Sequence, residues 1–168
     1  MSLFVRNLVF TFVVPGTGAV LAPWWILSRH GAGGPKQWAA MVAIAVGALL
    51  YFACVRVFAV VGRGTPGPWD APRKLVVVGP YRWVRNPIYV AALVVVLGEA
   101  WLFLAASLLW YALAMAVTVH LFVIGYEEPH LRRRFGNAYE EYLRTVPRWI
   151  PRRPRTGTDG GLAADRRP

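Results

Sequence analysis

The stretch from Ile88 to Tyr126 reads IYVAALVVVLGEAWLFLAASLLWYALAMAVTVHLFVIGY, and Glu99 is its single charged residue. Its 39 residues are too many for one membrane-spanning helix, which needs roughly 20. At about 1.5 Å of rise per residue, they suffice for two helices joined by a tight turn. We therefore predict an apolar helical hairpin, Ile88–Phe103 followed by Ala105–Tyr126, which turns somewhere within Gly98–Ser107.

Two further apolar stretches precede this hairpin, at about Leu8–Leu27 and Trp38–Val61. The first exceeds the roughly 7–15 apolar residues of a signal peptide, so we interpret it as a retained helix, kinked at Pro15-Gly16. Of the 168 residues, 57% are hydrophobic and only 16% are charged, against about 25% charged in an ordinary soluble domain. The sequence predicts an all-α, multi-pass transmembrane helical bundle of about four spans.

Basic residues gather at one end of the predicted spans. They are Arg63, Arg73, Lys74, Arg82 and Arg85 between residues 62 and 87, and Arg132, Arg133, Arg134 and Arg144 after Tyr126. The loop at residues 28–37 has only Arg29 and Lys36, and the hairpin turn has none. Because Lys and Arg are enriched in cytoplasmic loops, we predict an integral membrane protein with both termini in the cytoplasm.

The net charge of +11 also has a simple membrane explanation. The tail at residues 152–168 is rich in Arg, Pro and Gly, and we expect it to be disordered and attracted to anionic membrane lipids. Nucleic acid is not an expected partner, because no folded basic domain stands outside the membrane. Cys54 is the single cysteine, which excludes a disulfide scaffold.

Two local patterns suggest chemistry that their context does not support. Residues 62–67, GRGTPG, match a dinucleotide-binding turn, but Pro66 and Pro68 prevent the helix that must follow it, so no Rossmann domain is expected. Residues 127–130, EEPH, contain one E-x-x-H motif, whereas a di-iron bundle needs two such motifs and two further Glu. No bound metal is therefore expected.

Two polar residues inside the apolar stretches each have two interpretations. His120 is either a hydrogen-bonded residue inside the bundle or a lining group of a polar cavity. Arg56 lies near the cytoplasmic end of the second predicted helix, so its side chain either extends to the interface or binds an anion in a lateral cavity. Both are candidate substrate-binding residues.

The adjacent carboxylates Glu127 and Glu128 are predicted to end the fourth helix at the cytoplasmic interface. Acids there oppose the helix dipole, and a cation facing them would explain their position. Pro129 suits the first turn of a new helix, in which apolar residues from Leu131 to Leu143 recur at helical spacing. We predict a cytoplasmic C-terminal amphipathic helix that lies on the membrane or caps the bundle.

The segment at residues 74–89 is dense in Tyr, Trp and Arg, a composition that is also typical of an interfacial anchor. Gly79-Pro80 predicts a turn. Asn86 is a plausible N-cap of the third helix, with Pro87 as its first residue.

Together these segments resemble the integral-membrane methyltransferases of the isoprenylcysteine carboxyl methyltransferase and phospholipid methyltransferase group. The matching residues are Leu75-Val76, Gly79-Pro80-Tyr81-Arg82, Arg85-Asn86-Pro87, Tyr89, Glu127-Glu128, Leu131, Phe135-Gly136, Tyr139, Tyr142 and Val146-Pro147-Arg148. The resemblance spans about residues 62–151. It implies a methyltransferase core at 62–151. With the apolar stretches and the composition of the tail, we expect a transmembrane helix pair at 1–61 before this core and a disordered basic tail at 152–168 after it.

The resemblance implies that S-adenosylmethionine binds without a Rossmann domain, under the C-terminal segment, while a lipid or hydrophobic acceptor enters from the bilayer. The implied cofactor-binding residues are Leu75, Val76, Tyr81, Asn86, Pro87, Tyr89 and Glu127, and the implied catalytic residues are Glu128 and Arg85. Carboxylates, aromatic faces and helix-end donors suit a cofactor with a sulfonium and an amino-acid moiety.

The implied reaction is methyl transfer to a carboxylate oxygen or an amine nitrogen of that acceptor. Val123 stands where the isoprenylcysteine enzymes have an Arg that is thought to hold the acceptor carboxylate, which argues against a prenylcysteine acceptor. The alternative function is a non-catalytic membrane adaptor that binds anionic lipid through the basic C-terminal segment. An adaptor has no reason to bind S-adenosylmethionine.

Overall fold

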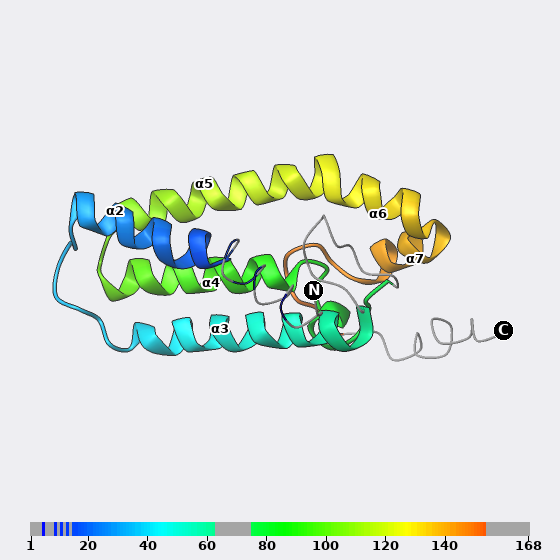
Figure 1. Cartoon of the computed structure of the whole chain (residues 1–168), viewed down its shortest axis with the longest axis horizontal. Coiled ribbons are helices and arrows are strands. Elements are labelled where there is room, and N and C mark those ends of the chain that lie inside the picture. The colour runs from blue at the N-terminus through cyan, green and yellow to red at the C-terminus, as the bar shows by residue number, and fades with distance from the viewer. Residues whose placement is uncertain are drawn as a thin grey trace.

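The computed structural model describes residues 15–62 and 75–153, preceded by Val5, Val9, Thr11 and Val13. Within these residues every regular element is a helix, which confirms the all-α class. Figure 1 shows α2 to α5 running side by side along the long axis of the molecule, with α6 and α7 at one end. Most of the glycine motif at 62–67, the basic residues Arg63, Arg73 and Lys74, and the tail after Arg153 lie outside the described residues.

The predicted helical hairpin is confirmed. Helix α4 spans Pro87–Leu102 and helix α5 begins at Ala106 and extends to Phe122. The turn between them lies at residues 103–105, where Leu104 has a positive φ of 49° and the amide of Ala105 donates to the carbonyl of Ala100 at 3.0 Å. The start of α4 and the end of α5 consequently meet at the same end of the bundle.

Helix α3 (Ala40–Val57) lies antiparallel to α4 and packs closely against it (Figure 1). A Cβ atom added at Gly47 would lie 2.9 Å from the carbonyl oxygen of Ala91, and one added at Gly98 would lie 3.2 Å from the amide nitrogen of Ile44. The absence of a side chain at Gly47 and Gly98 therefore allows the backbones of α3 and α4 to come this close. We call this contact the α3–α4 seam.

The N-terminal helical segment contains a π-helix, η1 (Thr17–Leu21), directly after Pro15-Gly16, where the sequence predicts a kink. Helix α2 (Ala22–His30) continues from it and packs against α5. The hydroxyl of Tyr111 on α5 donates to the carbonyl oxygen of Gly18 at 2.6 Å, which fixes the segment to the hairpin.

Two helical stretches among the described residues are long and apolar enough to cross a bilayer, Ala40–Val61 and Ala106–Phe135. Helix α4 is apolar but shorter. Large apolar side chains face outward along these helices, including Leu49 at 70% and Trp110 at 72% exposure. In water such an apolar surface would favour aggregation, whereas the hydrocarbon interior of a bilayer would cover it.

Two predictions about the C-terminal half are wrong. Helix α5 does not end at the Glu pair, because it continues through the π-helix η5 (Val123–Glu127) into α6 (Glu128–Phe135). The amide of Glu128 bonds to the carbonyl of Val123, and this wider turn carries the helix past Pro129, which has no amide hydrogen to donate.

The single amphipathic helix from Leu131 to Leu143 is also interrupted. Gly136, with φ 52° and ψ −129°, ends α6, and α7 (Asn137–Thr145) begins immediately after it. This backbone conformation strongly favours glycine. The apolar periodicity continues across the break because both short helices turn apolar residues toward the bundle.

Candidate functional site

The carboxylate of Glu128 is buried at the polar end of the bundle, a name we give to residues 75–89 and 127–153. Arg85 Nη1 donates to Glu128 Oε1 at 2.9 Å. Arg148 donates from Nε to Oε1 at 2.8 Å and from Nη2 to Oε2 at 3.0 Å, which is a bidentate pair. Three segments that are distant in sequence therefore meet at one carboxylate.

These guanidinium groups are the cations that face Glu128. Glu128 is 7% exposed at its side chain, while Arg85 and Arg148 are 13% and 32% exposed. The hydrogen bonds that Arg148 donates to Glu128 raise the pKa of the Arg148 guanidinium, so this group stays positively charged. Both oxygens of Glu128 are engaged, so its carboxylate holds other parts of the chain in place.

The second carboxylate, Glu127, has a different partner. The hydroxyl of Tyr89, in the first turn of α4, donates to Glu127 Oε2 at 2.9 Å. This bond joins the start of α4 to the end of η5, so the structure brings together two predicted cofactor-binding residues that are 38 positions apart. The neighbouring carboxylates thus bind one tyrosine and two arginines, respectively.

Val76 and Tyr81 are buried against Cys54 of α3. The turn predicted at Gly79-Pro80 is present as a short 3-10 helix, η4 (Gly79–Arg82), in which Gly79 has φ 60°. The backbone carbonyl of Tyr81 accepts a hydrogen bond of 2.8 Å from the hydroxyl of Tyr142. Burial raises the pKa of Tyr81 well above its ordinary value, so its phenol stays neutral.

Leu75 is half-buried beside Val76, at the start of the described part of this loop. Pro87 is the first residue of α4, as predicted, and it is buried. Asn86 precedes it but makes no side-chain cap. Its Nδ2 instead donates to the backbone oxygen of Arg148 at 3.3 Å.

That bond is one of several to the strap, which we define as residues 146–153. The amide of Arg85 donates to the carbonyl of Pro147 at 2.9 Å, and the amide of Arg152 donates to the carbonyl of Trp83 at 3.0 Å. Figure 1 shows the strap turning back from α7 toward the start of α4. The strap therefore covers the loop that carries Arg85 and Asn86.

The two candidate substrate-binding residues have different surroundings. His120 Nδ1 accepts a hydrogen bond of 3.1 Å from Nε1 of Trp149 in the strap, which favours the interpretation of His120 as a hydrogen-bonded bundle residue. Arg56 is exposed in the last turn of α3. Among the described residues, no hydrogen bond or ion pair joins Arg56 to the Glu128 cluster.

Two buried tyrosines of α7 lie next to the charged cluster. Burial raises the pKa of Tyr139 to about 12, with a smaller contribution from the negative charge of Glu128. Burial likewise raises the pKa of Tyr142. Both hydroxyls therefore stay neutral near pH 7.

At the polar end, the buried Nε of Arg85 has no hydrogen-bond partner among the described residues. It is a guanidinium donor, a kind of group that is rarely left unpaired when buried. No group of three or more His, Cys, Asp or Glu that could hold a metal ion occurs in the described part of the chain.

Sequence reasoning did not identify Arg148, Trp149 or Tyr142 as site residues. Val146-Pro147-Arg148 and Tyr142 belong to the resemblance, but nothing local indicates their contacts. Arg148 reaches Glu128 across 20 positions, and its backbone oxygen reaches Asn86 across 62. Such pairings follow from the return of the strap, which short-range patterns do not predict.

The family described as phospholipid methyltransferase matches the chain over residues 35–138, which is more than half of its length. The match begins just before α3 and includes Arg85, Tyr89, Glu127 and Glu128. The strap follows its end. No curated protein matches the chain.

Proposed function

Because the chain belongs to the phospholipid methyltransferase family and is a membrane methyltransferase, we propose that it transfers a methyl group from S-adenosylmethionine to a lipid or small hydrophobic acceptor. The observation that carries this proposal is the polar end. There Tyr89 binds Glu127 while Arg85 and Arg148 bind Glu128, all within reach of the first turn of α4.

The donor set at the polar end fits this cofactor. When bound, S-adenosylmethionine supplies an electrophilic methyl group on a positively charged sulfur. Glu127 offers a negative charge, and the rings of Tyr81 and Tyr89 offer the aromatic faces that favour cations. The buried Nε of Arg85 offers a donor suited to the carboxylate of an amino-acid moiety.

The remaining residues of the proposed set contribute position and shape. Leu75, Val76 and Pro87 supply apolar wall, and Asn86 holds the strap through its amide. Glu128 is a positioning residue, since its two oxygens hold Arg85 and Arg148 in place. Methyl transfer depends mainly on alignment of donor and acceptor, which a rigid cluster of this kind would supply.

The surroundings of Val123 bear on the class of acceptor. Its side chain is completely buried in η5, four residues before Glu127. An apolar residue there cannot form a charge-assisted bond to a carboxylate, which argues against a prenylcysteine carboxylate held at this point. We propose a carboxylate oxygen or amine nitrogen on another lipid or hydrophobic molecule as the methylated atom.

For the membrane orientation we propose four spans, with both termini in the cytoplasm. The amides of Gly33 and Gln37 donate to the carbonyls of Phe103 and Leu102, so this loop and the hairpin turn lie together at the end opposite the polar end. Cysteine substitutions at Ala32, which is exposed in this loop, and at Thr156 should be labelled by an impermeant maleimide from opposite sides of the membrane. Labelling from the same side would contradict this topology.

The proposed reaction is tested with protein reconstituted in lipid nanodiscs, methyl-labelled S-adenosylmethionine and extracted membrane lipids. We expect label to enter the lipid fraction, and we expect Glu127→Gln to abolish the transfer. Glu141→Gln, a change on the exposed surface of α7, is the matched control and should retain it. A protein that neither binds the cofactor nor transfers label would contradict the proposal and favour an adaptor.

A further inference from the structure

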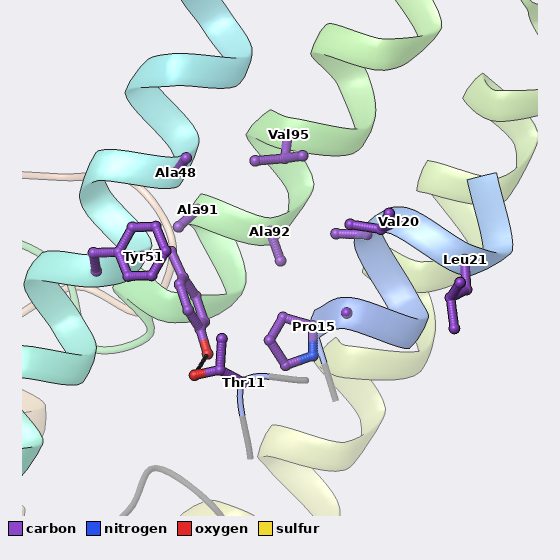
Figure 2. Close-up of a pocket in the computed structure, with 12 residues that line it drawn as sticks. Thr11, Pro15, Val20, Leu21, Ala48, Tyr51, Ala91, Ala92 and Val95 are labelled. Atoms are coloured by element: carbon purple, nitrogen blue, oxygen red, sulfur yellow. Dashed lines mark hydrogen bonds between the residues drawn. The ribbon is translucent and has the colours of Figure 1, made fainter. Parts of the chain in front are cut away.

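An apolar cavity of about 480 Å³ lies between the N-terminal helical segment, α3 and α4 (Figure 2). Among the described residues that line it, only Thr11 and Tyr51 have polar side chains, and the hydroxyl of Tyr51 donates to Thr11 Oγ1 at 2.9 Å. The rest of the wall is aliphatic apart from Phe52, with small residues such as Ala48 and Ala92 leaving the space open.

The cavity has the size and lining of a hydrocarbon site. Small-molecule sites typically have volumes of about 300–1,000 Å³. A charged or strongly polar ligand would leave its polar groups without partners along most of this wall. The wall follows the N-terminal segment from Pro15 to Leu21, a helical rise of about 9 Å, and continues to Thr11, which suits an elongated chain.

The cavity also opens toward the surface that a bilayer would cover. Val20, Leu21 and Phe52 on its wall are 58%, 57% and 60% exposed, although each is a large apolar residue. Figure 2 shows Val20 and Leu21 at one end of the cavity, and the Tyr51–Thr11 pair at the other. A hydrocarbon chain could therefore enter sideways from surrounding lipid.

The end with the Tyr51–Thr11 pair adjoins the polar end of the bundle. Tyr51 lies one helical turn before Cys54, which packs against Tyr81. Ala91, which lines the cavity from α4, is two residues from Tyr89. The apolar cavity and the proposed cofactor site are thus consecutive along the same two helices.

We propose that this cavity binds one hydrocarbon chain of the methyl acceptor and directs the head group toward Tyr81 and Tyr89. Chain binding follows from the cavity itself, while the identification of the chain with the methyl acceptor rests on the proposed function. The Tyr51–Thr11 pair marks the boundary at which the chain ends and the polar head begins.

The test uses the full chain in nanodiscs and a long-chain fatty amine that carries a diazirine in mid-chain. Ala48→Phe places a ring in the cavity, and Ala45→Phe places the same ring on the exposed face of the same helix as a control. We expect saturable photolabelling on peptides that contain Val20 or Ala92. Ala48→Phe should weaken probe binding by at least about tenfold, the effect of displacing about two buried methylene groups.

Two further measurements connect the cavity to the reaction. The fatty amine should inhibit methyl transfer to extracted lipids, and Ala48→Phe should lower that transfer while leaving the affinity for S-adenosylhomocysteine unchanged. Ala45→Phe should behave as the wild type in both. This pattern would support the cavity as the binding site of the acceptor chain.

Other results overturn it. Equal labelling of both variants would mean that the probe labels the protein from the surrounding lipid. If instead the protein were an unlabelled dimer, and Ala48→Phe converted it to a monomer, the cavity would be assigned to a second copy of the chain. Saturable labelling with normal transfer in Ala48→Phe would remove the acceptor assignment. Saturable labelling of a protein that binds no S-adenosylhomocysteine would instead overturn the proposed function, and the acceptor identity with it.

Discussion

The polar end and the α3–α4 seam are assembled in opposite ways. At the polar end, a single buried carboxylate holds Arg85 and Arg148, and directional hydrogen bonds join segments up to 69 positions apart, as between Arg152 and Trp83. In the seam, Gly47 and Gly98 leave no room for a side chain, so that the backbones of α3 and α4 pack closely against each other. The seam depends on shape alone.

The difference indicates where this protein can change without losing its fold. A buried charge cluster loses much of its stabilisation when one partner is removed, because the others are left buried and unpaired. A seam of small residues loses stability in proportion to the volume that is added. We infer that the polar end concentrates function and sensitivity, while the seam supplies the rigid frame that positions α4.

The largest expected effect is that of Glu128→Gln. The change leaves two guanidinium groups without their carboxylate, and removal of one partner of a buried pair costs about 3–5 kcal/mol. We expect a large fall in the thermal midpoint of the detergent-solubilised protein, together with loss of cofactor binding as the strap detaches.

The matched control is Glu140→Gln, which breaks the ion pair between Glu140 and Arg132. That pair has a distance of 2.9 Å, but its side chains are 46% and 51% exposed. Exposed pairs contribute about 0–1 kcal/mol. Equal losses in the two variants would show that the Glu128 cluster has no special role in holding the polar end together.

A smaller effect is expected from Tyr89→Phe. The change removes the hydroxyl that donates to Glu127 and leaves the fold of α4 intact. A hydrogen bond to a charged group contributes roughly 1.5–3 kcal/mol, so affinity for S-adenosylhomocysteine should fall by about one to two powers of ten. Tyr126→Phe, on the exposed side of η5, should leave the calorimetric affinity as in the wild type.

The seam is tested by Gly47→Ala. The new Cβ would lie 2.9 Å from a backbone oxygen of α4, which cannot move aside as a side-chain end can. Overpacking of this kind costs about 1–3 kcal/mol. Thermal unfolding should report a lower midpoint, with cofactor affinity preserved in the folded protein. Gly125→Ala, where a Cβ would meet nothing within 4 Å, should not destabilise.

If Gly47→Ala weakened cofactor binding more than it lowered stability, the frame and the polar end would not be separable. The comparison between the two regions would then fail, because the seam would be part of the binding machinery.

The helical hairpin and the grouping of its polar ends could be predicted from the sequence because each depends on local properties. The length of the stretch from Ile88 to Tyr126 requires a turn, and a turn places Tyr89 and Glu127 at the same end. Pro87 at the first position of α4 and the turn at Gly79 follow from the backbone restrictions of those residues.

The predictions that failed depend on longer-range or finer geometry. Pro129 lies in the first turn of α6, as predicted, but the π-helix η5 joins α6 to α5 without the expected break. Helical spacing alone did not reveal the break at Gly136. The bidentate pair between Arg148 and Glu128 depends on how the strap returns to the bundle. The apolar cavity depends on the side-chain volumes of three separate helical segments.

The central claim, that the polar end binds the methyl donor, is tested most directly by calorimetric titration of S-adenosylmethionine, in the absence of an acceptor, into the detergent-purified protein and its Glu127→Gln variant. The account predicts saturable binding to the wild type and an affinity at least about tenfold weaker for the variant, since a charged hydrogen-bond partner is lost. The thermal midpoint of the variant should stay close to that of the wild type. Absence of binding to the wild type, or equal affinity in both proteins, would contradict the claim.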